Sequence, residues 1–536
     1  MTRMKKLLPI IIILCIVAGF YAGVHICNKE RSIIDNSGNK FDYMLNLIEA
    51  KYVDGVDIDS LVEKCIPKML EELDPHSAYI PKEELKAANE DLSGSFSGIG
   101  VRFSIQDDTI NISEVIRSGP SQQAGILAGD KIITVNDTLF VGKGVCTNEN
   151  AMKKLKGPKG SYVRLGIKRF GEDELLKFNV RRDDIMIESV EVAYVIDNKW
   201  GYIQVDKFGE NTFAEFLTKA VELYYNYAQG LIVDLRGNGG GYLEIATLMA
   251  NQFLEKDETI VYTEGKNSPK KVYSADGTGI LRKFPLVILV DETSASASEV
   301  LAGAIQDNDR GTIIGRRTFG KGLVQEQMML PDGSAVRLTI ARYHTPSGRC
   351  IQKAYTNGER EEYAMDIIDR YNRGEFFSQD SIVLDKEHEY RTKGGRTVYG
   401  GGGIMPDIFV PSDSTKITKY CENVIRQGVS AQFALKYSNQ NRQRLAHCNT
   451  YSLLLEELDK EAIYDQFVEF AKEKGVTADL DEIIESKEVL EDNLRLNIIY
   501  MLLNMQEYVR YRNIDDPIVK KAIEVLENGE SYPTVK

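Results

Sequence analysis

The spacing of apolar residues changes along the chain and divides it into regions with different predicted structure. From about residue 40 to 80, and again beyond about Lys416, apolar residues recur at helical spacing, which predicts two helical regions. Between about 94 and 183 the chain has short β-type runs separated by Gly, Asp and Asn turns. These runs lie at 99–103, 110–116, 131–135, 162–167 and 176–180. This stretch is therefore predicted to be a small, mostly β domain.

Strand and helix patterns alternate from about residue 200 to 410. Residues 231–235 and 286–290 are continuous apolar runs, as strands buried on both faces require. Each is followed by a turn of small residues and a helical pattern. This region is predicted to be an α/β core. A polar insertion at about 357–396 is expected to be an exposed excursion from that core.

An apolar run near the N-terminus has the features of a membrane anchor. Residues 7–24 are uncharged and long enough to span a bilayer, and Arg3, Lys5 and Lys6 before them orient the N-terminus toward the cytoplasm. No clear cleavage site follows, so an uncleaved anchor is favoured over a removed signal peptide. The rest of the chain is then expected to be exported.

Composition narrows the classes of function. The chain has 536 residues, enough for about three or four domains. Its net charge of −14, without a basic stripe, argues against sequence-independent nucleic-acid binding. The seven cysteines are scattered, odd in number and without a C-x-x-C pair, which argues against a disulfide scaffold and a structural zinc site. No metal or other cofactor is expected.

The first candidate for chemistry is a serine-rich turn at residues 294–299, between a strand ending at Val290 and a helical pattern. A serine at such a turn projects from the edge of the sheet, and the N–H groups that begin the helix can stabilise an oxyanion. Ser296, the middle serine, is therefore a candidate nucleophile. The structural alternative is that Ser296 is an N-cap, with Glu299 completing a capping box.

Lys321, flanked by two glycines, is the candidate general base. It lies 25 residues after Ser296 and just after a predicted strand at 312–314. A desolvated lysine can lose its proton near neutral pH and then act as a base. Extended backbone would place Lys321 and Gln325 on one face, because a spacing of four is even, so Gln325 could orient the amine. The alternative is an ordinary exposed turn lysine.

Two other catalytic interpretations compete. Residues 315–321 nearly match a phosphate-binding loop, but Gly322 stands where the magnesium ligand should be, and no helix obviously follows. Among the five histidines only His344, at the end of a predicted strand at 335–343, is placed to act as a base. A turn histidine is the alternative there.

Two glycine loops could bring bare N–H groups to a peptide. The loop at 237–241 follows a buried strand and would let a reacting carbonyl approach closely, as in an oxyanion hole; a flexible strand-to-helix turn is the alternative. In the β domain, Gly98, Ile99, Gly100 and Val101 lead into a strand edge. Such a loop can hold the C-terminal carboxylate of a peptide while the peptide adds as an extra strand.

Together these segments closely resemble the carboxyl-terminal processing, or tail-specific, serine peptidases. The matching segments, in the order of the family, are 73–77, 98–101 with 124–130, 234–241, 294–299, 318–322 with Gln325, 343–348 and 402–407. The resemblance makes Ser296 the nucleophile, Lys321 the base and Gln325 the residue that orients the lysine. It makes the oxyanion hole from the N–H groups of Ala297 and of a glycine, Gly241 or Gly240.

The resemblance implies a multidomain α+β fold: a mixed α/β peptidase core with an inserted, mostly β, PDZ-like domain, an N-terminal helical segment and a C-terminal helical domain. The expected segments are a membrane anchor or signal peptide at 1–30, the helical segment at 36–90, the PDZ-like domain at 91–184, the peptidase core at 185–412 and the helical domain at 413–536. The helical domain has no counterpart in minimal relatives, so substrate gating, dimer formation and partner docking all remain open for it. The loop also departs from the family at Gly237, where relatives often carry a larger polar residue.

The implied activity is that of a serine endopeptidase. It would bind the accessible, apolar C-terminal tail of an envelope protein through the PDZ-like domain and cleave that protein through an acyl-enzyme, without a cofactor. With the anchor, the expected location is the bacterial inner membrane, with the catalytic region in the periplasm or otherwise outside the membrane. An adaptor or activator protein and an oligomeric state are left open. The alternative from another class is an inactive, peptidase-like PDZ adaptor that binds protein C-termini.

Overall fold

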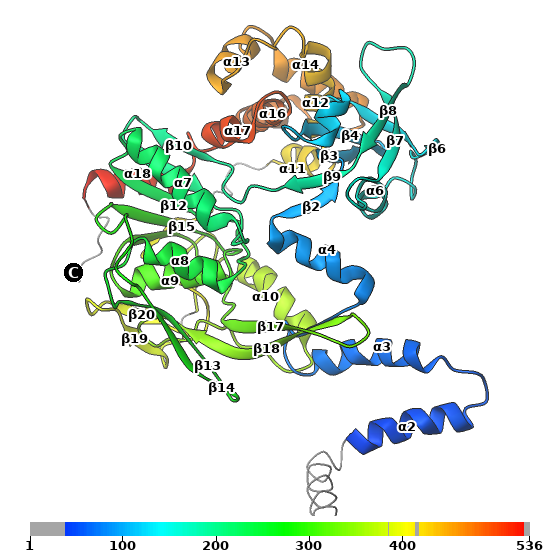
Figure 1. Cartoon of the computed structure of the whole chain (residues 1–536). Helices are drawn as coiled ribbons and strands as arrows, with labels where there is room; N and C mark the ends of the chain where they lie inside the picture. The colour runs from blue at the N-terminus through cyan, green and yellow to red at the C-terminus, as the bar shows by residue number, and fades with distance from the viewer. Residues whose placement is uncertain (1–37, 384, 413–417, 530–536) are drawn as a thin grey trace, which may run out of the picture. The chain divides into compact units, whose positions relative to one another are not determined.

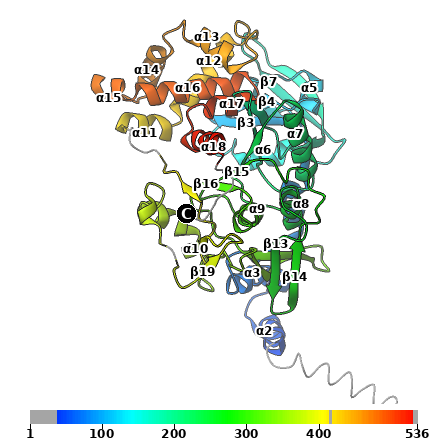
Figure 2. The same cartoon turned by 90° about the vertical axis from the view of Figure 1, so that its left-hand side faces the viewer.

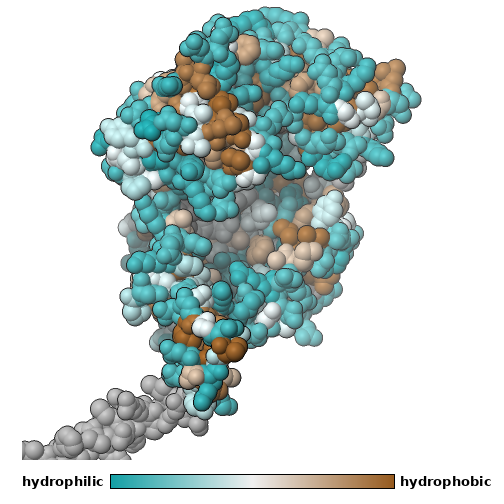
Figure 3. All heavy atoms as spheres, turned by 90° about the vertical axis from the view of Figure 1, so that its right-hand side faces the viewer, coloured by the Kyte–Doolittle hydropathy of each residue, from teal (hydrophilic) through white to brown (hydrophobic). Residues whose placement is uncertain are grey.

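The structure is a computed structural model that describes residues 38–383, 385–412 and 418–529 (Figure 1). The described chain divides after Leu73 into two units. The first unit contains helices α2 (Gly38–Lys51) and α3 (Ile58–Glu71). Helix α2 carries exposed apolar side chains, among them Tyr43 and Met44. The space-filling view in Figure 3 shows several apolar patches on the surface of the molecule.

The predicted membrane anchor is contradicted along the described chain. In the ranges given above, no helix is long and apolar enough to cross a membrane. The longest described helix, α16 (Lys487–Leu502), has 16 residues, whereas a span needs about 20 apolar residues. The prediction of an inner-membrane anchor was therefore wrong for the described residues, and the predicted envelope location loses the basis on which it was made. The apolar run at 7–24 itself lies outside them.

The predicted β domain is a sheet within the second unit, with strands in the order β3-β4-β5-β7-β8 and β6 paired to β5. The bounds are β3 Val101–Gln106, β4 Thr109–Val115, β5 Lys131–Val135, β6 Thr138–Leu139, β7 Tyr162–Lys168 and β8 Leu176–Arg181. All five strands predicted for this stretch are present. Helices α5 (Pro120–Ala124) and α6 (Asn148–Leu155) complete the domain. Strand β3 is at the edge of the sheet, where a further strand could pair.

The chain enters and leaves this domain through a short ribbon. Helix α4 (Lys82–Ser93) leads into strand β2 (Ser95–Gly98), which pairs antiparallel with β9 (Asp183–Met186). The pairing joins the two connections to the core.

The predicted α/β core is a six-stranded sheet in the order β10-β11-β12-β15-β16-β21. The bounds are β10 Ala193–Ile196, β11 Trp200–Gln204, β12 Gly230–Asp234, β15 Leu286–Val290, β16 Thr312–Gly315 and β21 Ile408–Phe409. The strands from β11 to β21 run parallel to one another, whereas β10 pairs antiparallel with β11. Every residue of β12 and β15 is buried, as the continuous apolar runs predicted. Because parallel strands end at the same edge, the turns after β12, β15 and β16 meet there.

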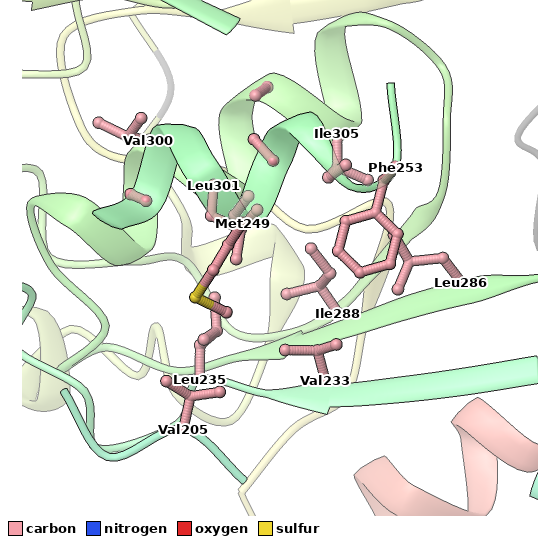
Figure 4. Packing of buried hydrophobic residues seen from close by; sticks show 14 of the residues in the cluster. Val205, Val233, Leu235, Met249, Phe253, Leu286, Ile288, Val300, Leu301 and Ile305 are labelled. Carbon is pink, nitrogen blue, oxygen red and sulfur yellow. The ribbon is translucent and has the colours of Figure 1, made fainter. Parts of the chain in front are cut away.

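Alternate residues of the central strands face two layers of helices. The first layer consists of α7 (Thr212–Tyr225), α8 (Leu243–Asn251) and α9 (Ala297–Asp307). Val233 and Ile288 pack into this layer, as Figure 4 shows. Ile232 and Leu289 point to the other face, where they pack with α18 (Pro517–Glu527). Figure 2 shows α18 beside β15 and β16.

Helix α18 is anchored at its first turn. The carboxylate of Asp516 caps the helix by accepting hydrogen bonds from the N–H groups of Ile518 and Val519, and Pro517 is the first helical residue. The same carboxylate lies 2.6 Å from a guanidinium nitrogen of Arg236, in the turn after β12. Helix α18 is thereby tied to the core sheet.

A second sheet has the order β1-β18-β13-β14, with β17 also paired to β18. The bounds are β1 Ala78–Ile80, β13 Thr259–Gly265, β14 Ser268–Ser274, β17 Leu323–Met329 and β18 Ala335–His344. All its pairings are antiparallel. This sheet brings the segment before the β domain beside the segment that follows Lys321.

The polar insertion folds into α10 (Arg360–Asn372), the short 3-10 helix η1 (Gln379–Ser381) and the ribbon β19 (Glu389–Arg391) and β20 (Thr397–Tyr399). The insertion was expected to be exposed, but this prediction was wrong for its central residues. Arg370 and Glu375 are each only 1% exposed. Arg370 donates hydrogen bonds to the carbonyl oxygens of Arg317 and Thr318, so these charges are buried against the core.

The helical periodicity predicted beyond residue 416 is confirmed. The helices before α18 are α11 Lys419–Arg426, α12 Val429–Asn441, α13 Tyr451–Leu458, α14 Ile463–Glu473, α15 Leu480–Glu485, α16 and α17 Met505–Arg512. They pack around a shared cluster that includes Phe433 and Phe467. The predicted fold class, a multidomain α+β protein with a mixed α/β core, is therefore correct.

Removing apolar volume from α18 should destabilise the core sheet. Val519 is 1% exposed and packs in the cluster on the second face of the sheet. We expect Val519→Ala to cost about 1–3 kcal/mol and to lower the thermal unfolding midpoint. Lys520→Ala, on the exposed side of the same helix, is the control and should leave the midpoint within about 1 °C. Equal midpoints for the two variants would show that α18 does not stabilise the sheet.

Candidate active site

Ser296 lies at the turn between β15 and α9, at the carboxyl edge of the parallel sheet. Its backbone has φ 55° and ψ −114°, a region that residues with a side chain rarely adopt. Ala295 and Ala297 on either side are buried, whereas Ser296 is partly exposed. The turn therefore presents the serine hydroxyl at the surface of the core.

Glu299, one turn into α9, connects this serine to the loop of Lys321. Its side chain is completely buried and accepts four hydrogen bonds. One oxygen, Oε2, accepts from the backbone N–H groups of Ser296 and Lys321, each at 2.8 Å. The other, Oε1, accepts from the Thr318 hydroxyl at 2.6 Å and the Gly320 N–H at 2.7 Å. A single carboxylate thus holds both backbone segments.

Burial raises the pKa of Glu299 to about 7, although all four hydrogen-bond donors favour its charged form. Only the ionised carboxylate can accept from all four donors at once, because protonation would turn one oxygen into a donor. The carboxylate and its donors therefore form one interdependent unit.

The environment of Lys321 favours a neutral amine. Burial is the first cause that lowers the pKa of Lys321, and the positive charge of Arg337 is the second. The charges of Glu299 and Asp74 oppose these effects without cancelling them. Tyr343, in β18, fixes the backbone of the same loop, because its hydroxyl bonds to the carbonyl oxygens of Ser296, at 3.0 Å, and of Lys321.

Gln325 is bound in a way that the sequence did not predict. Strand β17 begins only at Leu323, and its pairing with β18 shifts register between Val324 and Gln325. The argument from even spacing therefore does not apply. The Nε2 group of Gln325 donates a hydrogen bond to the carbonyl oxygen of His76, at 2.6 Å. Within the described part of the chain, no hydrogen bond joins the Lys321 amine to Ser296 Oγ or to Gln325.

The two glycines proposed for the oxyanion hole differ in their contacts. The N–H of Gly240 donates to the side chain of Asn238 at 2.8 Å, so it is already occupied. Gly241 lies opposite Phe208, and a Cβ there would come within 2.2 Å of the Phe208 carbonyl oxygen. Gly240 is equally restricted, since its Cβ would lie 2.8 Å from the Ser296 Cβ. Gly240 requires glycine because it lies against the serine turn, and Gly241 requires it because it lies against the backbone of Phe208.

The loop of Gly98, Ile99, Gly100 and Val101 connects β2 to the edge strand β3. The carbonyl oxygens of Ile99 and Gly100 accept hydrogen bonds from the N–H groups of residues 121 and 116. The Ile99 side chain is 2% exposed and belongs to the core of the domain. The loop is thereby fixed, with its side chain turned away from the surface.

The alternative base, His344, is held by other groups. Its ring stacks on Tyr262 at 4.7 Å, and Nδ1 lies 3.1 Å from the carbonyl oxygen of Gly348. His344 is the last residue of β18, where it pairs with Tyr262, and these contacts fix its ring there. In the described residues no group of three or more His, Cys, Asp and Glu could hold a metal ion.

Three segments of the chain match known protein families. Residues 199–359 match peptidase family S41 and residues 97–181 match the PDZ domain, while 420–504 match a family of unknown function. The chain is 32% identical over 388 residues to carboxy-terminal processing protease CtpB of Bacillus subtilis, covering 69% of this chain and 79% of the relative. It is 37% identical to CtpA of the same organism over 361 residues, covering 66% of this chain and 76% of that one.

The chain belongs to the carboxy-terminal processing proteases of peptidase family S41. It is a serine peptidase of this family with a PDZ domain. Among solved structures, the photosystem II D1 C-terminal processing protease is 30% identical, with 58% of this chain and 89% of that chain covered and a TM-score of 0.34.

Three contributors to the site escaped the sequence analysis. The sequence indicated Glu299 only as part of a capping box with Ser296. Its other three hydrogen-bond donors lie in the loop of Lys321, which the capping pattern does not involve. Tyr343 and His76 lie in segments by which the sequence resembles the family, but nothing in their spacing relates them to Lys321. They reach the site through pairing of strands that are far apart in the sequence.

The backbone of Ser296 gives a test with two variants that both lack the hydroxyl. Glycine usually destabilises a protein relative to alanine, but at φ 55° it should relieve a cost of about 1–3 kcal/mol. We therefore expect Ser296→Gly to unfold at a higher temperature than Ser296→Ala, measured by calorimetry. A lower midpoint for the glycine variant would show that the turn is not strained.

Loss of the Glu299 carboxylate should disrupt the site. In Glu299→Gln one acceptor becomes an amide donor that faces the N–H groups it formerly accepted from. Removing hydrogen bonds to a charged group costs about 1.5–3 kcal/mol, so kcat/KM should fall about 10- to 100-fold or more. Glu485→Gln, on the exposed surface of α15, is the matched control. Peptide-cleavage rates comparable to the control would exclude a role for Glu299.

Proposed function

We propose that this peptidase cleaves proteins that it recognises by an accessible, apolar C-terminal tail, with Ser296 as nucleophile and Lys321 as general base. The observation that carries the proposal is the shared oxygen of Glu299. The amide nitrogens of Ser296 and Lys321 are each 2.8 Å from it, so they lie no farther apart than twice that distance. Side chains anchored so closely can meet over one peptide bond.

The reaction then follows an acyl-enzyme course. The neutral Lys321 amine takes the proton of the Ser296 hydroxyl while Oγ attacks the peptide carbonyl carbon. When the tetrahedral intermediate collapses, the C–N bond breaks and the ammonium returns the proton to the leaving amine. Water then attacks the ester, gives a proton to Lys321 and releases the acid, with the proton returning to Ser296. Each step uses only these side chains and water.

The N–H groups of Ala297 and Gly241 are the oxyanion donors in this proposal. Ala297 is the first residue of α9, where an N–H has no acceptor within the helix. Gly241 is preferred to Gly240, because the N–H of Gly240 already donates to Asn238. Gln325 serves to orient the lysine amine.

The PDZ domain supplies the recognition of the tail. The loop at Gly98, Ile99, Gly100 and Val101 precedes an edge strand, so a peptide can add to β3 while the N–H groups of the loop bind its terminal carboxylate. The protein substrate then needs an unfolded C-terminus, because only an extended segment can pair with an edge strand.

The catalytic assignment is tested with an unfolded protein substrate that ends in an apolar tail. We expect Ser296→Ala and Lys321→Arg to reduce kcat at least about 10³-fold, and His344→Ala to keep most of it. Arginine is the sharper test, since it keeps the positive charge but cannot become a base. In the wild type, the acid limb of kcat/KM should lie below about 10.4, the ordinary pKa of lysine.

Two outcomes would contradict the assignment. Retained cleavage by Lys321→Arg would remove Lys321 as the base, and loss of cleavage in His344→Ala would move that role to the histidine. A substrate with an amidated C-terminus is the control for recognition. Its KM should rise while its kcat stays the same.

A further inference from the structure

The turn at residues 74–77 belongs to one of the segments by which the sequence resembles the family, yet it has no part in the proposed chemistry. Its centre is Asp74, which is 5% exposed. Asp74 Oδ1 accepts from the N–H groups of His76 and Ser77, each at 2.9 Å, and Oδ2 accepts from the Ser77 hydroxyl at 2.5 Å. Thr339 of β18 adds a hydroxyl bond of 3.0 Å to Oδ1. The turn is thus fixed both internally and to the second sheet.

The fixed turn presents one backbone carbonyl to the candidate site. The oxygen of His76 accepts the hydrogen bond from Gln325 Nε2 at 2.6 Å. A glutamine amide has a donor end and an acceptor end. With Nε2 bound to His76, the remaining Oε1 is the end that can accept from the lysine amine.

The other side of His76 is held by the insertion. Its ring Nε2 lies 3.0 Å from the hydroxyl of Tyr363, in α10. The same hydroxyl accepts a hydrogen bond from Gln352 Nε2 at 3.3 Å. Gln352 Oε1 accepts from the N–H of Gly322, the residue after Lys321, at 2.8 Å. The contacts therefore run in a chain from Gln325 through His76, Tyr363 and Gln352 back to the lysine loop.

We propose that the 74–77 turn, held by Tyr363, is a positioning element for Lys321 that fixes the Gln325 amide with Oε1 toward the lysine amine. The inference rests on the proposed Ser/Lys function. It assigns positioning roles to Ser77, His76 and Tyr363, none of which needs to touch the substrate.

The polarity of the amide matters because a general base needs a free lone pair. With Oε1 facing Lys321, the amine donates to the oxygen and its lone pair stays available to Ser296. If the amide were reversed, its N–H would bind the lone pair and block proton transfer. The 74–77 turn opposes this arrangement, because a reversed amide would place Oε1, an acceptor, against the carbonyl oxygen of His76.

The charges around the lysine are compatible with this role. Arg337 of β18, Glu299 of α9 and Asp74 of the turn act on Lys321. Burial first, and the nearby charge of Lys321 second, lower the pKa of His76 to about 4. The imidazole is therefore neutral at pH 7 and adds no positive charge beside the base.

The test uses Tyr363→Phe and Ser77→Ala in the full chain, because each removes hydroxyl bonds of the turn and keeps the backbone of His76. We expect kcat to fall about tenfold with KM unchanged. The acid limb of the kcat profile should move to lower pH, since a reversed amide no longer stabilises the ammonium. Tyr355→Phe makes the same chemical change on the ring beside Tyr363 and should alter neither.

Gln325→Glu gives the opposite shift. A carboxylate beside the lysine stabilises the ammonium, so the acid limb should move to higher pH. If kcat falls in Tyr363→Phe and Ser77→Ala while the acid limb stays in place, the turn has only a structural role and the inference is overturned. An unchanged kcat in both would overturn it as well. Activity in Lys321→Arg would instead overturn the proposed function, so the two failures are distinguishable.

Discussion

The candidate site depends on one buried carboxylate. Glu299 lies in the core, where an unpaired charge would be very costly, so it requires donors from its surroundings. It finds them only when the turn after β15 and the loop after β16 come together. The parallel pairing of these strands, with Val290 opposite Gly315, brings both to the same edge of the sheet. Folding of the sheet and assembly of the site are therefore a single event.

The lysine loop is fixed from a second direction by the insertion. Glu375 accepts hydrogen bonds from Arg317 and Arg370, and Arg370 donates to two carbonyl oxygens of the same loop. The Lys353 amine lies 4.1 Å from the ring centres of both Phe319 and Tyr363. Buried ion pairs add little net stability, but they define one arrangement because any other leaves a charge without a partner. Here they define the path of the backbone that carries Lys321.

Sequence patterns predicted the parts of the fold that depend on local periodicity. Strands buried on both faces are apolar throughout, so β12 and β15 were evident, and helical spacing located the C-terminal helices. The sequence did not indicate which helices pack against which faces of the sheet. The sequence of α18 has the pattern of an ordinary amphipathic helix. Only the structure shows that it covers the face of the core sheet that carries Ile232 and Leu289. The burial of Arg370 was missed for the same reason, because its partners are some 50 residues away in sequence.

The same distinction separates the site candidates that the sequence could propose from the contacts that only the structure shows. Ser296 and Lys321 each sit in a local context with its own signal, a strand-to-helix turn and a pair of glycines. The prediction that Gln325 lies on the same face as Lys321 assumed an unbroken strand. The register shift between Val324 and Gln325 invalidates that assumption. Its orientation follows instead from His76, a residue 249 positions earlier in the chain. The contacts that fix Gln325 therefore come from the pairing of strands that are distant in the sequence, and no local spacing could have predicted them.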